Sequence, residues 1–279
     1  MKKISRRSFL AASGLTIAAL ALTACGGSAS TASSAASSVA ASSEAASTSA
    51  AAAELTTVEA GKLTMATNAA FPPYEMTTDA GAFEGIDIDT AQAIADKLGL
   101  ELQIDDMDFD AALLSVQQGK ADIAMAGVTV TDERKNVMDF SDSYATGIQS
   151  IIVPEGSEIA SPDDLAGKKI GTQRGTTGYI YCSDDFGDEN VVAYDDGLTA
   201  VQALKNGQVD AVVIDNAPAQ EFVAANPGLK VLDTSYAEED YAIGMAKGSA
   251  LEDAVNKALE ELKADGTLQA IVDKYINAN

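Results

Sequence analysis

The amino-acid sequence predicts an α/β protein made of two lobes. Short apolar strands alternate with amphipathic helices from about residue 62 to the C-terminus, which is typical of this fold class. The alternation begins again after Ile151-Ile152-Val153-Pro154, a fully apolar strand that ends in a polar segment. A second extended run, Asp240-Tyr241-Ala242-Ile243-Gly244, comes late in the chain. These two runs are candidates for strands that connect two lobes with a cleft between them.

Hydrophobic periodicity predicts the elements in order. Strands are expected at 62–67, 101–106, 123–127, 148–153, 169–172, 191–194, 211–214, 230–232 and 241–246. Helices are expected near 89–98, 109–118, 131–137, 162–165, 175–182, 198–206 and 218–225. Two more helices close the chain on either side of Gly266, with apolar stripes formed by Leu251, Val255, Ala258, Leu259 and Leu262, and by Leu268, Ile271, Val272 and Tyr275.

Residues 85–98 are expected to join an extended segment to a helix. Apolar and acidic residues alternate in Ile86-Asp87-Ile88-Asp89, as in a short strand with one apolar face. Asp89 or Thr90 then caps a helix that ends at Gly99. On this interpretation the carboxylates of Asp87 and Asp89 face solvent.

The first 24 residues predict an export signal. Basic residues up to Arg7 precede an apolar run from Phe9 to Leu22, which is too short to span a bilayer. The run ends in Leu22-Thr23-Ala24-Cys25, which resembles a bacterial lipobox and implies cleavage before Cys25 and a lipid on its sulfur. Ser5-Arg6-Arg7-Ser8-Phe9-Leu10 also resembles a twin-arginine motif, so the general and the twin-arginine export routes both stay open.

Residues 25–58 are expected to form a flexible tether. From Gly26 to about Ala53 the chain consists almost only of Ala, Ser, Thr and Gly, which supply too little bulky apolar surface to offset the entropy lost on folding. The sequence therefore predicts a globular body at the outer face of the cytoplasmic membrane, in contact with the membrane through the lipid anchor only.

Charge and residue usage exclude several partners and chemistries. The chain has 18 basic and 42 acidic residues, and the export signal holds four bases and no acid, so the mature part carries 14 bases against 42 acids, a net charge of −28. Such a chain repels nucleic acid, so no nucleic-acid partner is expected. The absence of histidine removes histidine-based triads and zinc sites. With Cys25 lipidated, Cys182 is expected to be an inert thiol, and no cofactor or metal site is predicted.

Five motifs, in order along the chain, identify a family resemblance. The body from about Lys62 to Asn279 resembles the extracellular solute-binding proteins for polar amino acids, which feed ABC importers and include glutamine-binding and histidine- or lysine-arginine-ornithine-binding proteins. The segments that carry the resemblance are Ala66–Glu75, Gly85–Leu98 with Met107-Asp108-Phe109, Ala126–Arg134, Gln173–Thr177 and Asp210–Asp215.

The resemblance implies a periplasmic-binding-protein fold of type II, in which two lobes joined by two hinge strands close on the ligand. Lobe 1 would comprise 59–149 and 238–279, and lobe 2 would comprise 150–237. It also implies that the chain is a monomer, that it is not an enzyme, and that it delivers an amino acid to ABC transporter permease subunits.

The resemblance also assigns roles to single residues. Arg134 would bind the α-carboxylate of the ligand in a bidentate geometry that lysine cannot copy, and Asp215 would bind the α-ammonium. The other implied ligand contacts are backbone and hydroxyl groups of Gly127 and Thr129, N–H groups at Thr177, and the rings of Phe71 and Phe109 around the ligand side chain.

Two departures from the family pattern bear on the ligand side chain. Asn68 stands where relatives that bind basic ligands have aspartate, and Gln173 stands where a glutamine-binding relative has lysine. Both departures slightly favour a ligand with a neutral polar side chain. Glu75 restores a negative charge if it faces the cleft, which keeps cationic ligands open.

Two other classes of function compete with transport. Some secreted dehydratases resemble the same fold and use cleft carboxylates, but no further acid–base pair remains here once Arg134 and Asp215 are assigned to the zwitterion. A sensory ligand-binding module ranks third, because such modules normally continue into a membrane span and a signalling domain, whereas this sequence stops at Asn279.

Overall fold

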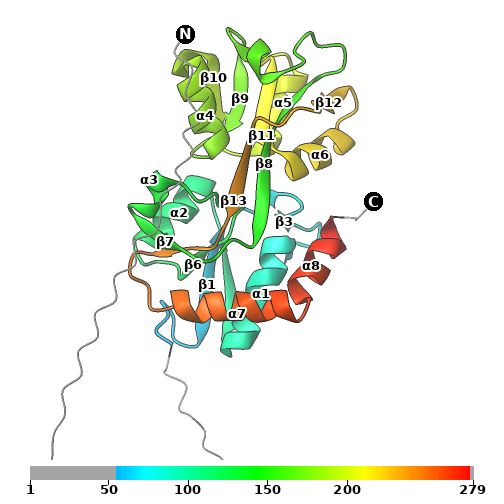
Figure 1. Ribbon diagram of the computed structural model, residues 1–279. Coiled ribbons are helices and arrows are strands. Elements are labelled where there is room, and N and C mark those ends of the chain that lie inside the picture. Colours follow the sequence, from blue (N-terminus) through cyan, green and yellow to red (C-terminus); the bar gives the residue numbers. More distant parts are fainter. Residues whose placement is uncertain (1–54, 277–279) are drawn as a thin grey trace, which may run out of the picture. The chain divides into compact units, whose positions relative to one another are not determined.

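The computed structural model describes residues 55–276, and the expected lipidation site at Cys25 lies outside them. Two sheets, each flanked by helices, make up most of this part of the chain, so the predicted α/β class is confirmed (Figure 1). None of the helices between residues 55 and 276 combines the length and the apolar character that crossing a bilayer requires.

The first sheet forms the base of what we call lobe 1. Its strand order is β5-β1-β6-β14-β7, with β1 parallel to β5 and β6 and with β14 antiparallel to its neighbours. The strands are β1 (Lys62–Thr67), β5 (Glu101–Asp106), β6 (Ile123–Ala124), β7 (Met138–Phe140) and β14 (Gly244–Ala246). The helices of this lobe are α1 (Ile86–Leu98), α2 (Phe109–Gln117), α3 (Asp132–Lys135), α7 (Glu252–Ala264) and α8 (Thr267–Tyr275).

The second sheet forms lobe 2. Its order is β10-β9-β11-β8-β12, and β13 also pairs with β8. The strands are β8 (Ala145–Pro154), β9 (Ile170–Gln173), β10 (Val191–Tyr194), β11 (Ala211–Asp215), β12 (Leu229–Val231) and β13 (Ala237–Tyr241). The helices are α4 (Thr177–Phe186), α5 (Gly197–Lys205) and α6 (Asn216–Ala225), with short 3-10 turns at Pro162–Leu165 and Asp188–Asn190.

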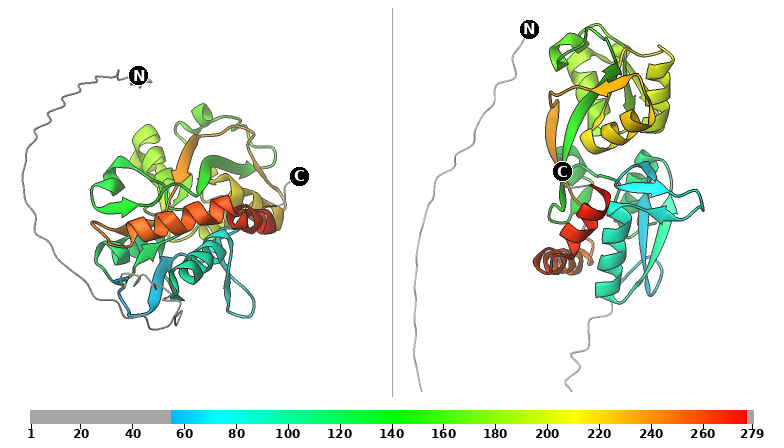
Figure 2. Two further views of the ribbon diagram at one scale, coloured as in Figure 1. Left: turned by 60° about the horizontal axis from the view of Figure 1, so that its bottom comes forward. Right: turned by 90° about the vertical axis from the view of Figure 1, so that its right-hand side faces the viewer.

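Two antiparallel strands join the lobes. β8 and β13 pair from Ala237 opposite Gln149 to Tyr241 opposite Ala145, and both run between the two lobes in Figure 1. The right-hand view of Figure 2 shows the same pair at one side of the molecule, between the two lobes. The two runs that the sequence marked as connections coincide with this joint only in part: Asp240 and Tyr241 end β13, whereas Ile151–Pro154 is the end of β8 that pairs with β11 and β12 within lobe 2.

Apolar stripes at helical spacing bury the helices of lobe 1. Ile94 of α1 and Val255 and Leu259 of α7 are fully buried in one apolar cluster with Leu63 and Met65 of β1. Their removal from water supplies the main favourable term for folding. The C-terminal pair of helices that the sequence predicted is thus confirmed, and Gly266 between them has a left-handed conformation (φ 81°).

The interpretation of residues 86–89 as an extended segment was wrong. Helix α1 begins at Ile86, and Gly85, with φ 135°, is the residue that precedes its first turn. Asp87 is fully buried rather than solvated, because its Oδ2 accepts hydrogen bonds from the backbone N–H of Gly127 (3.0 Å) and the hydroxyl of Tyr144 (2.8 Å). Alternation over only four residues cannot distinguish a strand from the first turn of a helix.

Sequence periodicity also missed short elements. The strands β2 (Ala70–Phe71), β3 (Glu75–Thr77) and β4 (Phe83–Glu84) form a small antiparallel sheet over lobe 1, and β7 was not expected either. Two or three residues are too few to show a period of two. The expected strand at 241–246 is in fact divided between β13 and β14, because the chain leaves the joint at Tyr241 and enters the sheet of lobe 1 at Gly244.

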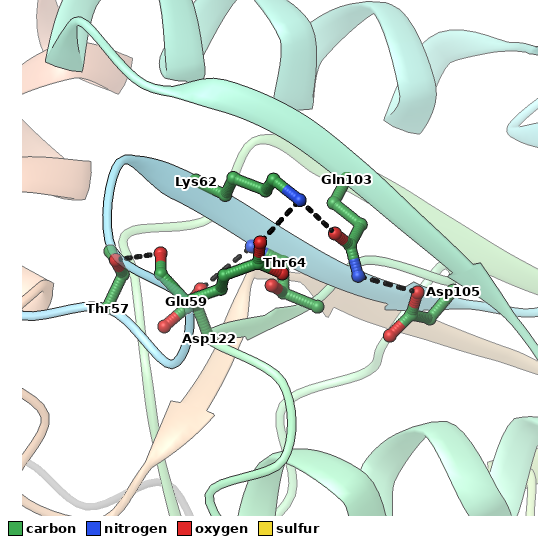
Figure 3. Close-up of polar contacts among 7 residues, drawn as sticks. All are labelled: Thr57, Glu59, Lys62, Thr64, Gln103, Asp105 and Asp122. Carbon is green, nitrogen blue, oxygen red and sulfur yellow. Dashed lines mark hydrogen bonds and ion pairs between the residues drawn. The ribbon is translucent and has the colours of Figure 1, made fainter.

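A polar network fixes the start of β1 (Figure 3). Asp122 accepts hydrogen bonds from the backbone N–H groups of Val58 (2.7 Å) and Thr64 (2.8 Å). Lys62 bonds Gln103 on the neighbouring strand β5 (3.1 Å) and forms an ion pair with Glu59 (2.6 Å). This ion pair is exposed and contributes little stability, whereas Asp122 satisfies backbone groups that would otherwise lack partners.

Replacing Gly85 with alanine is expected to lower the free energy of unfolding by about 3 kcal/mol or more. A Cβ at Gly85 would overlap the backbone carbonyl of Tyr74, and φ 135° is a conformation that L side chains rarely adopt. Gly81→Ala is the matched control, because Gly81 also has a positive φ but has open space around it, so about 1 kcal/mol is expected there. Urea unfolding of both variants measures the difference; equal losses would contradict the overlap argument.

Candidate functional site

One cleft brings together every binding residue that the sequence predicted within the described part of the chain. Lobe 1 contributes Asn68, Phe71, Phe109, Gly127, Thr129 and Arg134, and lobe 2 contributes Gln173, Thr177 and Asp215. Sequence reasoning did not assign three further lining residues, Glu75, Ala126 and Thr176, although it considered Glu75. The cleft therefore lies between the lobes, with charged groups from both lobes and with aromatic rings from lobe 1.

Arg134 is a buried cation on the lobe 1 side of the cleft. It lies on α3, whose N-terminus is capped by the hydroxyl of Thr131, and it is only 8% exposed. Its guanidinium donates to the backbone carbonyls of Thr129 (2.7 Å) and Gly175 (3.1 Å) and lies 5.3 Å from the ring centroid of Phe109. Burial lowers the pKa of Arg134, and the negative charge of Glu239 opposes this effect. Arg134 is thus a fixed positive charge that already contacts both lobes.

The N-terminus of α4 faces the same region from lobe 2. Thr176 caps the helix by accepting from the N–H of Tyr179, and Thr177 is the first helical residue. Unpaired N–H groups and the helix dipole make such a terminus favourable for an anion. Arg134 and this terminus together create a positive region in the cleft.

Glu239 is a site residue that sequence reasoning missed. It lies on β13, and its Oε2 accepts hydrogen bonds from the hydroxyls of Thr129 (3.2 Å) and Thr177 (3.0 Å) and from the amide of Gln149 (3.0 Å). One carboxylate oxygen thereby links both lobes and β8. In sequence, Glu239 lies within the acidic run Glu238-Glu239-Asp240, which is typical of a solvated segment, yet the strand alternates exposed and buried residues there.

Asp215 ends β11 and faces the cleft rather than capping the next helix. It occupies the position before α6, but its side chain makes no capping hydrogen bond. The hydroxyl of Tyr241 on β13 donates to its Oδ1. Burial raises the pKa of Asp215 to about 7; the hydrogen bond from Tyr241 opposes this rise, while the nearby charge of Glu239 adds to it. Asp215 is therefore a buried acid that favours a cationic partner.

Asn68 and Gln173 meet across the cleft. The Nε2 of Gln173 donates to the Oδ1 of Asn68 (2.8 Å), and the Nδ2 of Asn68 donates to the carbonyl of Met107 (3.0 Å). Both side chains are buried and neutral. The pair therefore holds the two lobes together without adding charge to this end of the cleft.

Aromatic rings and a glycine shape the remaining wall. The ring of Phe71 stacks near that of Tyr74, with 6.0 Å between the centroids. Gly127 has φ 55°, and a Cβ there would approach the Phe71 ring to 2.9 Å. Only glycine allows the backbone of residue 127 to approach the ring this closely.

Glu75 faces the cleft and is completely buried. Within residues 55–276, neither of its carboxyl oxygens accepts a hydrogen bond, but the protonated group lies within hydrogen-bond reach of the carboxylate of Asp87. Burial raises the pKa of Glu75 well above its usual range, and the charge of Asp87 raises it further. Glu75 thus faces the cleft, as the option of a cationic ligand requires, and it supplies a negative charge there when it is ionised.

Cys182 lies away from the cleft, in the core of lobe 2. It is fully buried, and burial raises the pKa of its thiol to about 12. At neutral pH it remains an unreactive thiol, as expected from the sequence.

The arrangement can hold a small molecule that has an anionic and a cationic group close together. Arg134 and the N-terminus of α4 favour the anion, and Asp215 favours the cation. Aromatic walls between them suit an aliphatic or planar stem. Across residues 55–276, no group of His, Cys, Asp or Glu side chains is arranged to hold a metal ion.

The amino-acid sequence of this chain matches one known protein family and several of its relatives. A profile described as "Bacterial extracellular solute-binding proteins, family 3" matches residues 63–278. The L-cystine-binding protein TcyJ of Escherichia coli (strain K12) is 34% identical over 226 residues, covering 79% of this chain and 85% of that protein. The arginine-binding extracellular protein ArtP of Bacillus subtilis (strain 168) is 32% identical over 224 residues, covering 77% of this chain and 86% of ArtP.

Solved structures of amino-acid-binding proteins are also similar to this chain in fold and sequence. An ancestral arginine-binding protein bound to arginine is 43% identical, with a TM-score of 0.74 and coverage of 78% of this chain and 99% of that one. The arginine-, lysine-, histidine-binding protein ArtJ of Geobacillus stearothermophilus is 34% identical, with a TM-score of 0.75 and coverage of 78% and 96%. The predicted two-lobed fold is confirmed. The matched proteins are substrate-binding proteins rather than enzymes, which bears out the prediction that this chain is not an enzyme.

Proposed function

Because this chain belongs to family 3 of the bacterial extracellular solute-binding proteins, we propose that it is a lipid-anchored receptor that binds a polar amino acid and delivers it to an ABC importer. The observation that carries the proposal is the presence of two buried groups of opposite charge, Arg134 and Asp215, in one cleft. An amino-acid zwitterion carries the complementary pair of charges on one carbon atom.

In this proposal the α-carboxylate pairs with the guanidinium of Arg134. Backbone N–H groups at Thr177 and Thr129 add donors, and Gly127 lets the ligand approach the backbone. The hydroxyls of Thr129 and Thr177 already donate to Glu239, so they serve the ligand only if they turn away from that carboxylate. The proposed roles of these two threonines therefore rest mainly on their backbone groups.

Asp215 then receives the α-ammonium, and the ligand side chain extends between Phe71 and Phe109 toward Asn68 and Gln173. A ligand held in this way contacts both lobes at once. Only a molecule that binds the closed state more tightly than the open state shifts the protein toward closure. Such closure distinguishes the loaded receptor from the empty one for the permease subunits.

Stabilisation by free amino acids tests the proposal. At a hundred times its Kd, a ligand adds about 2.7 kcal/mol to the free energy of unfolding. For a body of this size, that raises the midpoint of thermal unfolding by roughly 5–10 °C. A thermal-shift screen of the tether-free body against the twenty amino acids is expected to show such a rise for one ligand or a few chemically related ones. The absence of any rise would contradict the proposed function.

The proposal keeps the predicted division of the chain, with a signal peptide at 1–24, a tether at 25–58, lobe 1 at 59–149 and 238–279 and lobe 2 at 150–237. It also includes a monomeric body and a lipid on Cys25. The motivation for the lipid is the Leu22-Thr23-Ala24-Cys25 sequence followed by a segment without bulky apolar residues.

Replacing Cys25 with alanine tests the anchor. Without the thiol there is no site for the lipid, so the protein is expected to appear in the medium or to remain unprocessed. Membrane fractionation of expressing cells, with the full-length wild type as the reference, measures the outcome. Normal processing together with unchanged membrane retention of the variant would contradict the anchor.

A further inference from the structure

Glu239 is a buried carboxylate that lies behind the wall of the cleft rather than in it. It is on β13, one of the two strands that join the lobes, and it is only 7% exposed. Its Oε2 accepts hydrogen bonds from two residues that line the cleft, Thr129 (3.2 Å) and Thr177 (3.0 Å), and from Gln149 of β8 (3.0 Å). The phenol of Tyr181 lies within reach of the same carboxyl group: burial raises the pKa of Tyr181, and a hydrogen bond to Glu239 raises it further.

The two threonines that Glu239 binds come from different lobes. Thr129 belongs to lobe 1, where its backbone forms a β-bridge with Tyr241 at the end of β13. Thr177 is the first residue of α4 in lobe 2, and the two hydroxyls are 3.5 Å apart. Because a hydrogen bond is lost once donor and acceptor are more than about 3.5 Å apart, Glu239 holds both hydroxyls only while the lobes are in contact.

The charge of Glu239 is unfavourable for the ligand that we propose. Arg134 and the N-terminus of α4 form the positive region for the α-carboxylate, and Glu239 is close enough to oppose the fall in the pKa of Arg134 that burial causes. A second carboxylate near this region repels that of the ligand. If Glu239 acted only through its charge, removing it would strengthen binding. If its hydrogen bonds hold the lobes together, removing it weakens binding, so the sign of the change distinguishes the two roles.

We propose that Glu239 is a positioning residue that latches the two lobes together through Thr129 and Thr177 without contacting the ligand. These hydrogen bonds add free energy to the closed state only, so they shift the equilibrium toward closure. The latch contacts no part of the ligand, and its contribution to affinity is therefore the same for each amino acid that binds. This inference rests on the proposed function, since it concerns closure around the same ligand.

Four proteins test the latch by their affinity and by their rate of ligand release. They are wild type, Glu239→Ala, Glu239→Gln and the matched control Glu238→Ala, which changes the preceding, exposed residue of the same strand. Calorimetry with L-arginine and with L-glutamine measures the affinities. The loss of each radiolabelled amino acid into an excess of the unlabelled one measures the dissociation rates.

Glu239→Ala is expected to weaken the binding of both amino acids by the same factor, at least about tenfold, which corresponds to about 1.4 kcal/mol. Most of this factor should appear as faster dissociation, because the lobes must separate before the ligand leaves. Glu239→Gln keeps one acceptor oxygen but no charge, so a smaller loss of about threefold to tenfold is expected. Glu238→Ala should stay within about twofold of wild type, and thermal unfolding of all four proteins checks the fold.

A double-mutant cycle tests whether Glu239 acts through the threonines. Thr177→Val removes the hydroxyl but keeps the backbone N–H that the proposed function assigns to the ligand. If the hydroxyl and the carboxylate form one latch, the combination of Glu239→Ala with Thr177→Val weakens binding clearly less than the product of the two single effects. Effects that multiply would show that the two groups act independently.

Paramagnetic relaxation in the ligand-free protein measures the latch without an amino acid. Gly175 of lobe 2 lies against lobe 1, because a Cβ at Gly175 would be 3.2 Å from the Cβ of Asp110. A spin label on the neighbouring, exposed position through Arg174→Cys therefore broadens the amide signals around Asp110 whenever the lobes close, whereas the native Cys182 is fully buried. Glu239→Ala is expected to reduce this broadening, and Glu238→Ala is expected to leave it unchanged.

The outcomes separate this inference from the proposed function. An unchanged or higher affinity of Glu239→Ala, a loss confined to one of the two amino acids, or multiplying effects in the cycle would overturn the latch and leave the receptor proposal intact. Equal broadening around Asp110 in wild type and Glu239→Ala would also overturn it. Failure of wild type to bind any amino acid would overturn the proposed function, and the broadening would still decide on the latch.

Discussion

Replacing Arg134 with methionine is expected to weaken the binding of L-arginine at least about a hundredfold. Arg134 is only 8% exposed, and the carboxylate of a ligand in this closed site would lose its buried counter-charge. Removing one partner of a desolvated charge pair typically costs about 2–5 kcal/mol, and about 1.4 kcal/mol corresponds to a factor of ten. Methionine keeps an apolar stem of similar length against Phe109, so the variant mainly removes charge and hydrogen bonds.

The neighbouring surface provides a matched control. Arg174→Met removes the same type of residue from an exposed position, where Arg174 forms only an outer ion pair with Asp195 (3.3 Å), so its affinity is expected to stay within about threefold of wild type. Arg134→Lys tests the geometry, because lysine keeps the charge but cannot form two parallel hydrogen bonds to a carboxylate. If Arg134→Met bound L-arginine as tightly as Arg174→Met, the assignment of Arg134 to the carboxylate would be wrong.

The long elements of this fold were predictable because their side chains repeat with a clear period. The stripe on α7 covers about three turns, and Val255 and Leu259 indeed enter the core. The binding residues were predictable because the family's motifs occur in this chain in the same order, and all nine predicted residues line one cleft. In both cases the information is local in sequence, so no knowledge of distant contacts was needed.

The buried acids were harder to predict, because their burial depends on contacts between distant segments. Asp87 is buried by Gly127 and Tyr144, which are 40 and 57 residues away. Glu239 contacts Thr129, Thr177 and Gln149, which come from both lobes and β8. In an acidic chain, such residues resemble the many solvated carboxylates around them. The buried–exposed alternation along β13 was a local signal, but it became meaningful only once β13 was paired with β8.

The contacts across the cleft suggest why the ligand can control closure. Arg134 with Gly175 and Asn68 with Gln173 form direct hydrogen bonds between the lobes, and Glu239 adds contacts to a threonine from each. These bonds are few: only that between Asn68 and Gln173 joins two neutral groups and contributes about 0.5–1.5 kcal/mol, whereas the bonds of Arg134 and Glu239 involve a charged group and contribute about 1.5–3 kcal/mol each. A ligand that pairs with Arg134 and Asp215 adds two charge-assisted contacts, which is enough to change the balance between open and closed states.

Asp215 gives the second large effect, and it depends on pH. Burial raises its pKa to about 7, so the carboxyl group gains a proton as the pH falls below 7. Only the ionised form pairs with the α-ammonium of an amino acid. Protonation of Asp215 is therefore expected to lower the affinity of wild type for L-arginine by up to about tenfold for each pH unit below 7.

Replacing Asp215 with asparagine is expected to weaken L-arginine binding at least about thirtyfold at pH 8, where the wild-type carboxyl group is ionised. At pH 5 the wild-type group is protonated and neutral like the amide, so the affinities of the two proteins should converge. Both proteins contain Glu75, so its own titration cancels in the comparison. Asp253→Asn, an exposed change on α7, is the control and should follow the wild-type pH profile. A constant ratio of affinities between wild type and Asp215→Asn from pH 5 to pH 8, measured by calorimetry, would show that Asp215 does not titrate in contact with the ligand.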